Sequence, residues 1–161
     1  MLKILTLPLF ILLASQALWA QGTQVAFGAL QQDTSLPVEV TAENLSVDQA
    51  TGEAVFTGNV VVGQGEMRLS AKRVLVVYRE ETDGIERMEA TGDVLLVSGP
   101  DAAESEKANY NIDDGTIVMT GNVLLTQGPS AITADRMTVQ LDSGTAQMSG
   151  SVKTILRTGD N

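Results

Sequence analysis

Few residues in this sequence can carry out acid–base, nucleophilic or metal chemistry. Histidine and cysteine are both absent from the 161 residues, which excludes Ser-His-Asp and Cys-His sites, His-ligated zinc and disulfides. Paired carboxylates remain at Glu80-Glu81 and Asp113-Asp114, and such pairs could hydrolyse glycosidic bonds. Both pairs fall in segments of turn composition, where Asp and Glu are ordinary. We therefore predict a protein that is not an enzyme and that needs no metal or cofactor.

The charged residues exclude some partners. The formal net charge is −10, which makes nucleic acid and anionic membrane surfaces poor partners. Four basic residues could meet lipid phosphates, but exposed Lys and Arg are common on any surface. We do not include these four residues in the binding site that is predicted at the end of this subsection. They are Lys72, Arg73, Lys107 and Arg136.

Residues 1–20 have the layout of a secretory signal peptide. Lys3 precedes an apolar run over residues 4–13, and small residues follow up to Ala20. We expect cleavage after Ala20, or alternatively after Ala17, and export of the mature chain. An uncleaved membrane anchor is the alternative, but the apolar run is shorter than the roughly 20 residues of a spanning helix and contains Pro8.

An internal repeat organises the chain after residue 36. One pattern, Thr/Ser-Gly-x-Val, has its glycines 34, 29 and 29 residues apart, at Gly58, Gly92, Gly121 and Gly150. In a second pattern a small residue precedes an apolar residue by three positions, and its small residues are 29, 34 and 29 residues apart, at 42, 71, 105 and 134. The two patterns agree if five extra residues lengthen one hairpin tip, at 79–84.

Each repeat of about 29 residues is predicted to contain two strands. Gly-containing turns bound the strands, and side chains alternate between apolar and polar along them. Near Ala71 and its repeat equivalents the inward parity changes, which we interpret as a β-bulge in those strands. The prediction is an all-β, open, twisted sheet of four stacked two-strand repeats, rolled into two walls around an apolar lumen. Residues 21–36 carry no repeat and are predicted to be a flexible N-terminal arm, and residues 159–161 a frayed C-terminus.

Several motifs, taken in order, resemble the OstA-like family of lipopolysaccharide transport. They are the opening from Pro37 to Glu43, Phe56-Thr57-Gly58-Asn59-Val60, Ala71-Lys72-Arg73-Val74, Thr120-Gly121-Asn122-Val123 and Ala134-Asp135-Arg136-Met137. The resemblance covers about residues 36–157, within an expected repeat domain at 37–158. It implies a periplasmic β-jellyroll that holds the acyl chains of lipopolysaccharide, in its lipid A moiety. It also implies head-to-tail stacking with further copies and with related OstA-like domains of the inner-membrane anchored and outer-membrane components.

Side-chain parity predicts which residues line the lumen and would contact lipid, although each could equally be packed core. They are Val38, Val40, Phe56, Val60, Leu69, Val74, Val76, Tyr78, Met88, Leu96, Tyr110, Ile112, Met119, Val123, Leu125, Ile132, Met137 and Val139. The two sheet edges, at 37–38 and 150–157, are interpreted as docking surfaces for β-augmentation. Two alternatives remain: a self-assembling β-solenoid scaffold with a dry core, and a membrane-anchored relative with an uncleaved N-terminal helix.

Overall fold

The computed structural model of the protein describes residues 22–27 and 33–156. These residues form one antiparallel sheet of 11 strands. None of them belongs to a helix with the length and apolar character needed to cross a membrane. The predicted signal peptide at 1–20 and the predicted frayed end at 159–161 lie outside the described residues. The prediction of an all-β, open and twisted jellyroll is confirmed.

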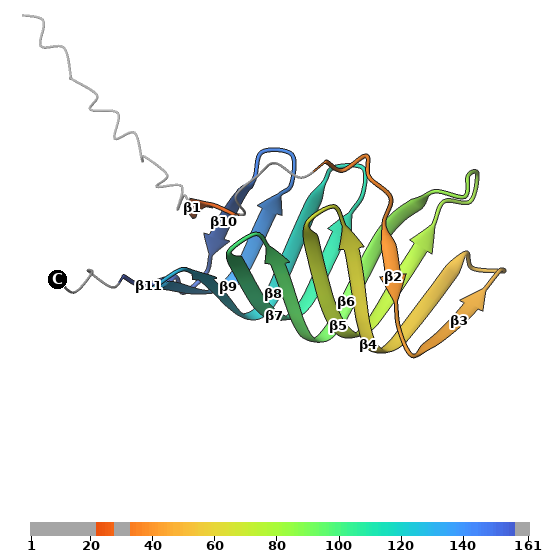
Figure 1. Cartoon of the computed structure of the whole chain (residues 1–161), viewed down its shortest axis with the longest axis horizontal. Helices are drawn as coiled ribbons and strands as arrows, with labels where there is room; N and C mark the ends of the chain where they lie inside the picture. The colour runs from red at the N-terminus through yellow and green to blue at the C-terminus, as the bar shows by residue number, and fades with distance from the viewer. Residues whose placement is uncertain (1–21, 28–32, 157–161) are drawn as a thin grey trace, which may run out of the picture.

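Most strands lie side by side in chain order, because a hairpin joins each one to the next (Figure 1). The order across the sheet is β1-β10-β9-β8-β7-β6-β5-β4-β2, while β11 also pairs with β9 and β3 also pairs with β4. The bounds are β1 Thr23–Ala26, β2 Glu39–Thr41, β3 Asn44–Asp48, β4 Glu53–Gln64, β5 Met67–Tyr78, β6 Ile85–Ser98, β7 Asp101–Asn111, β8 Thr116–Gln127, β9 Ser130–Gln140, β10 Thr145–Ser149 and β11 Lys153–Ile155.

Every long strand bends at its middle, and the bends form one row of corners along the sheet (Figure 1). The single sheet therefore makes two walls that meet at the corners, and we call the space between them the trough. Hairpin tips on the opposite side form two rows. The first row contains the turns at 65–66, 99–100 and 128–129, and the second row contains those at 49–52, 79–84, 112–115 and 141–144. We call the gap between the two rows the mouth.

The corners are built by a β-bulge whose position differs from our prediction. Thr57 pairs with Arg73 and Val60 pairs with Ala71, so Gly58 and Asn59 together face one residue of β5. The extra residue therefore lies in the Thr-Gly strand, not in the strand of Ala71. The same shift recurs in β6 and β8. The parity change after Ala71 is the response of β5 to that bulge: Lys72 and Arg73 are both exposed, whereas residues 67–71 alternate between buried and more exposed positions.

Left-handed backbone conformation explains why glycine recurs at the corners. Gly58 has a φ of 81° and Asn59 a φ of 43°, a region that glycine and asparagine adopt more easily than other residues. A Cβ added to Gly58 would lie 2.5 Å from a carboxylate oxygen of Glu43. That carboxylate accepts a hydrogen bond of 2.5 Å from the Asn59 amide. Equivalent pairs close the other corners: Lys72 with Asp93, Glu106 with Asn122, and Asp135 with Ser151.

Part of the predicted flexible arm is a strand. Residues 23–26 form β1, which pairs with β10 from Thr23 opposite Met148 to Ala26 opposite Thr145. Phe27, directly after it, is only 2 % exposed and belongs to the core. The sequence did not reveal this strand because it stands outside the repeat and becomes stable only by pairing with β10, more than 100 residues away.

Candidate functional site

The interior of the trough is the candidate site, and all 18 predicted lumen residues lie in it. Thirteen of them are buried members of one continuous hydrophobic cluster: Val60, Leu69, Val74, Val76, Met88, Leu96, Tyr110, Met119, Val123, Leu125, Ile132, Met137 and Val139. The other five are partly buried and pack against that cluster: Val38, Val40, Phe56, Tyr78 and Ile112. Side-chain parity thus located the interior, and both walls contribute to it.

Side chains of both walls belong to one hydrophobic cluster, so they meet inside the trough. At one internal gap, lined by Val62, Met67, Leu69 and Tyr110 among others, the free volume is about 10 Å³. That is room for about one water molecule. An acyl chain could enter only if the walls moved apart. Met67, Met88, Met119, Met137 and Met148 are all buried, and unbranched methionine adapts easily to such a change of shape.

One buried hydrogen bond joins the two walls across the mouth. The hydroxyl of Tyr110, from the second-row side of β7, donates to Oε1 of Gln64, at a first-row tip, over 2.6 Å. Both residues are buried, with Gln64 only 3 % exposed. Burial, followed by the nearby negative charge of Asp142, raises the pKa of Tyr110 to about 12, while the Gln64 hydrogen bond opposes the shift. The phenol is therefore held neutral at the top of an apolar interior.

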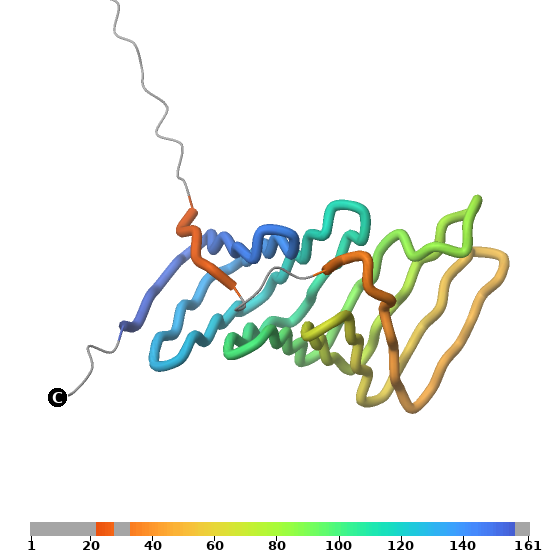
Figure 2. The backbone as a smooth tube through the Cα atoms, turned by 45° about the horizontal axis from the view of Figure 1, so that its top comes forward, coloured from red at the N-terminus to blue at the C-terminus, as the bar shows by residue number. Residues whose placement is uncertain are grey.

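The N-terminal segment, described at 22–27 and 33–38, lies along the mouth between the two rows of tips (Figure 2). Near one end, the Ala26 carbonyl accepts a 2.6 Å hydrogen bond from the Gln127 amide, and the Phe27 N–H donates to the Gly144 carbonyl over 2.8 Å. Further along, Gln64 Nε2 donates to the Thr34 and Leu36 carbonyls over 3.0 and 2.9 Å. These contacts bridge the first row to the second, so the segment helps to keep the walls together.

These closing residues were missed by the sequence analysis, although a signal was present. Gln64 and Gln127 hold the same place in the repeat, directly before a turn glycine. A polar residue before glycine by itself predicts only a turn. In the structure both side chains donate to carbonyls of the N-terminal segment. A glutamine that recurs at this position could have been recognised as a ligand for backbone groups, but its partner has no repeat pattern of its own.

The carboxylate pairs considered for catalysis do not form a site. Glu80, Glu81, Asp113 and Asp114 are exposed in second-row turns, and Asp113 forms an ion pair with Arg79. Within the described residues no three acidic side chains gather closely enough to hold a metal ion.

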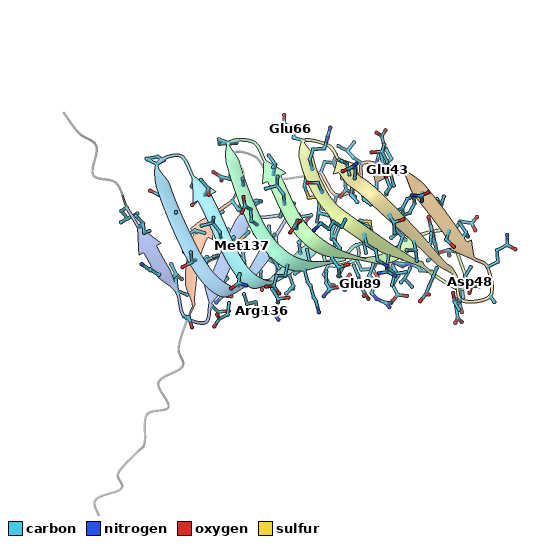
Figure 3. All side chains as sticks on the ribbon, turned by 90° about the horizontal axis from the view of Figure 1, so that it is seen from below. Glu43, Asp48, Glu66, Glu89, Arg136 and Met137 are labelled. Carbon is cyan, nitrogen blue, oxygen red and sulfur yellow. The ribbon has the colours of Figure 1, made fainter. Side chains whose placement is uncertain are left out.

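The four basic residues left out of the site, Lys72, Arg73, Lys107 and Arg136, are exposed on the outside of the corners. Figure 3, which views the molecule from that side, has Arg136 and Glu43 on this surface. The corners lie on the opposite side of the trough from the mouth, so these charges do not line it.

Comparison with known proteins relates this chain to a family. Residues 39–145 match the family model described as LptA/(LptD N-terminal domain) LPS transport protein. That match covers most of the repeat domain. The chain belongs to this family. Its trough is thus the interior of an LptA/LptD N-terminal type domain.

Individual relatives agree with this family. The chain is 35 % identical over 115 residues to an uncharacterised protein of Rhizobium meliloti, covering 67 % of this chain and 61 % of that one. It is 32 % identical over 91 residues to the lipopolysaccharide export system protein LptA of Haemophilus influenzae, covering 56 % and 47 %. The matched part is less than two thirds of the length of either relative.

A solved structure shares the fold. LptH of Pseudomonas aeruginosa, titled as the LptA-homologous periplasmic component of the lipopolysaccharide transport device, superposes with a TM-score of 0.69 at 16 % identity. The superposition covers 78 % of this chain and 99 % of that one.

Proposed function

We propose that the mature chain is a non-catalytic periplasmic carrier that shields the acyl chains of lipopolysaccharide on their way from the inner to the outer membrane. One observation supports this most: a continuous apolar interior runs between the two walls of a sheet that does not close on itself. Such an interior can take up acyl chains and pass them on at its ends. One of the relatives, LptA of Haemophilus influenzae, is a lipopolysaccharide export system protein, which agrees with this cargo.

Magnitudes explain why the carrier needs no chemistry of its own. Burying one methylene is worth about 0.8 kcal/mol, so an acyl chain of about 12 carbons gains roughly 10 kcal/mol on leaving water. Transfer from one such interior to another exchanges similar surroundings, so it needs little net energy. The barrier is the opening of a filled trough, in which the mouth contacts break and the walls pivot at the corners. A partner that supplies energy would drive this step.

The ends of the sheet support the proposed partners. At one end β2 and β3 each pair with β4, and at the other β11 pairs with β9. Large apolar side chains are exposed at both ends, among them Leu45 on β3 and Ile155 on β11. We propose that these edges join further copies and related domains by β-augmentation, giving a continuous trough.

Photo-cross-linking in cells that make lipopolysaccharide tests the carrier function. A photoreactive phenylalanine at Phe56, which faces the interior, should give a lipopolysaccharide adduct. The matched control is Arg73, in the neighbouring strand and exposed on the outside, which should give none. If Phe56 captures no lipid in a folded and exported protein, the carrier function is wrong. The alternative would then be a β-solenoid scaffold, because such a protein also has a filled interior.

A further inference from the structure

The strand β1 covers the edge of one wall at the C-terminal end of the sheet. It lies antiparallel to β10, with Thr23 opposite Met148 and Val25 opposite Ala146. Val25 packs against the hydrophobic core, and the next inward residue, Phe27, is 2 % exposed. The Phe27 N–H also donates to the Gly144 carbonyl. β1 and Phe27 therefore close both the backbone edge and the apolar interior at this end.

The strand β3 at the other end has matching side chains without cover. Its inward-parity residues Leu45 and Val47 are 57 % and 60 % exposed. They lie opposite Phe56 and Ala54 of β4. Among the described strands, β3 pairs only with β4. A further sheet edge would cover these side chains.

The repeat fixes where β3 of a second copy would add. Gly58 of β4 and Gly150 after β10 are equivalent, so Phe56 corresponds to Met148 and Ala54 to Ala146. If the repeat continued past β10, Leu45 of the second copy would lie opposite Met148 and Val47 opposite Ala146. Those places are held by Thr23 and Val25. Both β1 and β3 also run from the corner towards the second row of tips, so their direction is the same.

Strand pairing in the other wall makes β1 and a docked β3 of a second copy mutually exclusive. β2 and β3 form one bent row beside β4, and β10 and β11 form one bent row beside β9. β1 covers β10 but not β11. If β1 stayed in place, β3 of a second copy would sit one strand further out, about 4.8 Å away. Then β2 of that copy could not pair with β11, because β2 and β3 belong to the same row.

We propose that β1 is an intramolecular cap, which must leave the edge of β10 before β3 of a second copy can dock there. The proposal rests on the head-to-tail stacking proposed above, and it adds that β1 regulates this stacking. Release of β1 also withdraws Phe27 from the interior at that end. Docking of the next copy and opening of the trough towards it are therefore one event, and an unpartnered chain keeps its apolar end covered.

A reversible lock tests the cap. Gln24 and Gln147 lie directly opposite each other, and both are exposed. The chain has no cysteine, so the double variant Gln24→Cys/Gln147→Cys can form a single disulfide between β1 and β10. The mature protein is compared oxidised and reduced by analytical ultracentrifugation. We expect self-association to be weaker by about tenfold or more in the oxidised form.

A release variant gives the opposite result without a disulfide. Phe27→Asp places a charge where the side chain is buried, so β1 should detach and self-association should tighten by about tenfold. Gln24→Asp is the matched control, since it adds the same charge to an exposed position of β1. Its association should stay within about twofold of that of the unmodified chain.

The outcomes separate this proposal from the carrier function. Equal association of the oxidised and reduced lock, or of Phe27→Asp and Gln24→Asp, would overturn the cap, even if Phe56 still captured lipid. Absence of self-association in every variant, Phe27→Asp included, would overturn it too. Loss of lipid capture with an intact response to the lock would instead overturn the carrier function alone.

Discussion

Replacing Tyr110 with phenylalanine tests whether the mouth is closed in solution. The change removes the hydroxyl that donates to Gln64 and leaves the ring in the core. Gln64 Oε1 then loses this partner while its side chain stays buried, at 3 % exposure. An acceptor left in this way costs about 1–3 kcal/mol. We expect Tyr110→Phe to lower the free energy of unfolding by that amount at pH 8, measured by urea unfolding followed by circular dichroism.

The pH dependence gives a sharper form of the same prediction. The pKa of Tyr110 is about 12 in the folded protein, against about 10 in an unfolded chain. Folding therefore favours the neutral phenol, and this stabilisation is complete below pH 10 and lost as the pH rises towards 12. Two pKa units correspond to about 2.7 kcal/mol in total, and about 1.4 kcal/mol of that is lost by pH 11. The variant has no phenol at this position, so the difference between the two proteins should shrink by about 1.4 kcal/mol between pH 8 and pH 11.

Either of two results would contradict a mouth closed by the Tyr110–Gln64 hydrogen bond. Unfolding free energies of the two proteins that run parallel from pH 8 to pH 11 would refute the buried, neutral phenol at the mouth. The variant Gln64→Ala also removes the bonds to the N-terminal segment, so its own effect does not isolate the bond to Tyr110. A double-mutant cycle of Gln64→Ala and Tyr110→Phe isolates that bond. A coupling energy near zero between the two substitutions would mean that the Tyr110–Gln64 bond does not hold the walls together.

Two further predictions concern the interior and the corners. Leu125→Ala, at a fully buried position, should destabilise the protein by about 2–5 kcal/mol in urea unfolding, while Leu45→Ala, at an exposed edge position, should change stability by less than about 0.5 kcal/mol. Gly121→Ala should destabilise the protein by about 1–2 kcal/mol or more, because Gly121 has a φ of 84° and the new Cβ would lie 2.7 Å from a carboxylate oxygen of Glu106. The control is Gly63→Ala, whose new Cβ meets only the flexible end of Arg68 at 3.4 Å. Equal losses of stability at the two glycines would contradict the corner geometry.

The repeat made much of this fold predictable. A turn chemistry and an alternation that recur four times leave little freedom for the strands between them, and the interior positions follow from parity alone. Parity could not say which strand carries the bulge, since an inward step of three residues in β5 is compatible with an extra residue on either side of the ladder. The left-handed Gly58 and Asn59 decide it.

The closing contacts could not be predicted in the same way. The bond between Tyr110 and Gln64 joins residues 46 positions apart in sequence, and Thr34 reaches Asp142 across 108 positions. Such pairs depend on how far the walls lean towards each other, which no local pattern encodes. The partner chosen by β1 depends on the same geometry, since β10 offers a free edge only after the whole sheet has formed.

A filled interior and a transport role are compatible because the apolar surface has to be covered when no lipid is present. An empty trough would expose the hydrophobic cluster to water, and its walls would close to recover that free energy. The contacts that hold the walls at the mouth are few polar bonds, while the corners are continuous backbone. Opening therefore breaks bonds worth about 1 kcal/mol each and leaves the sheet ladder intact. An acyl chain that replaces the contacts between the walls regains most of what opening loses, so the same residues can serve as core in one state and as binding surface in the other.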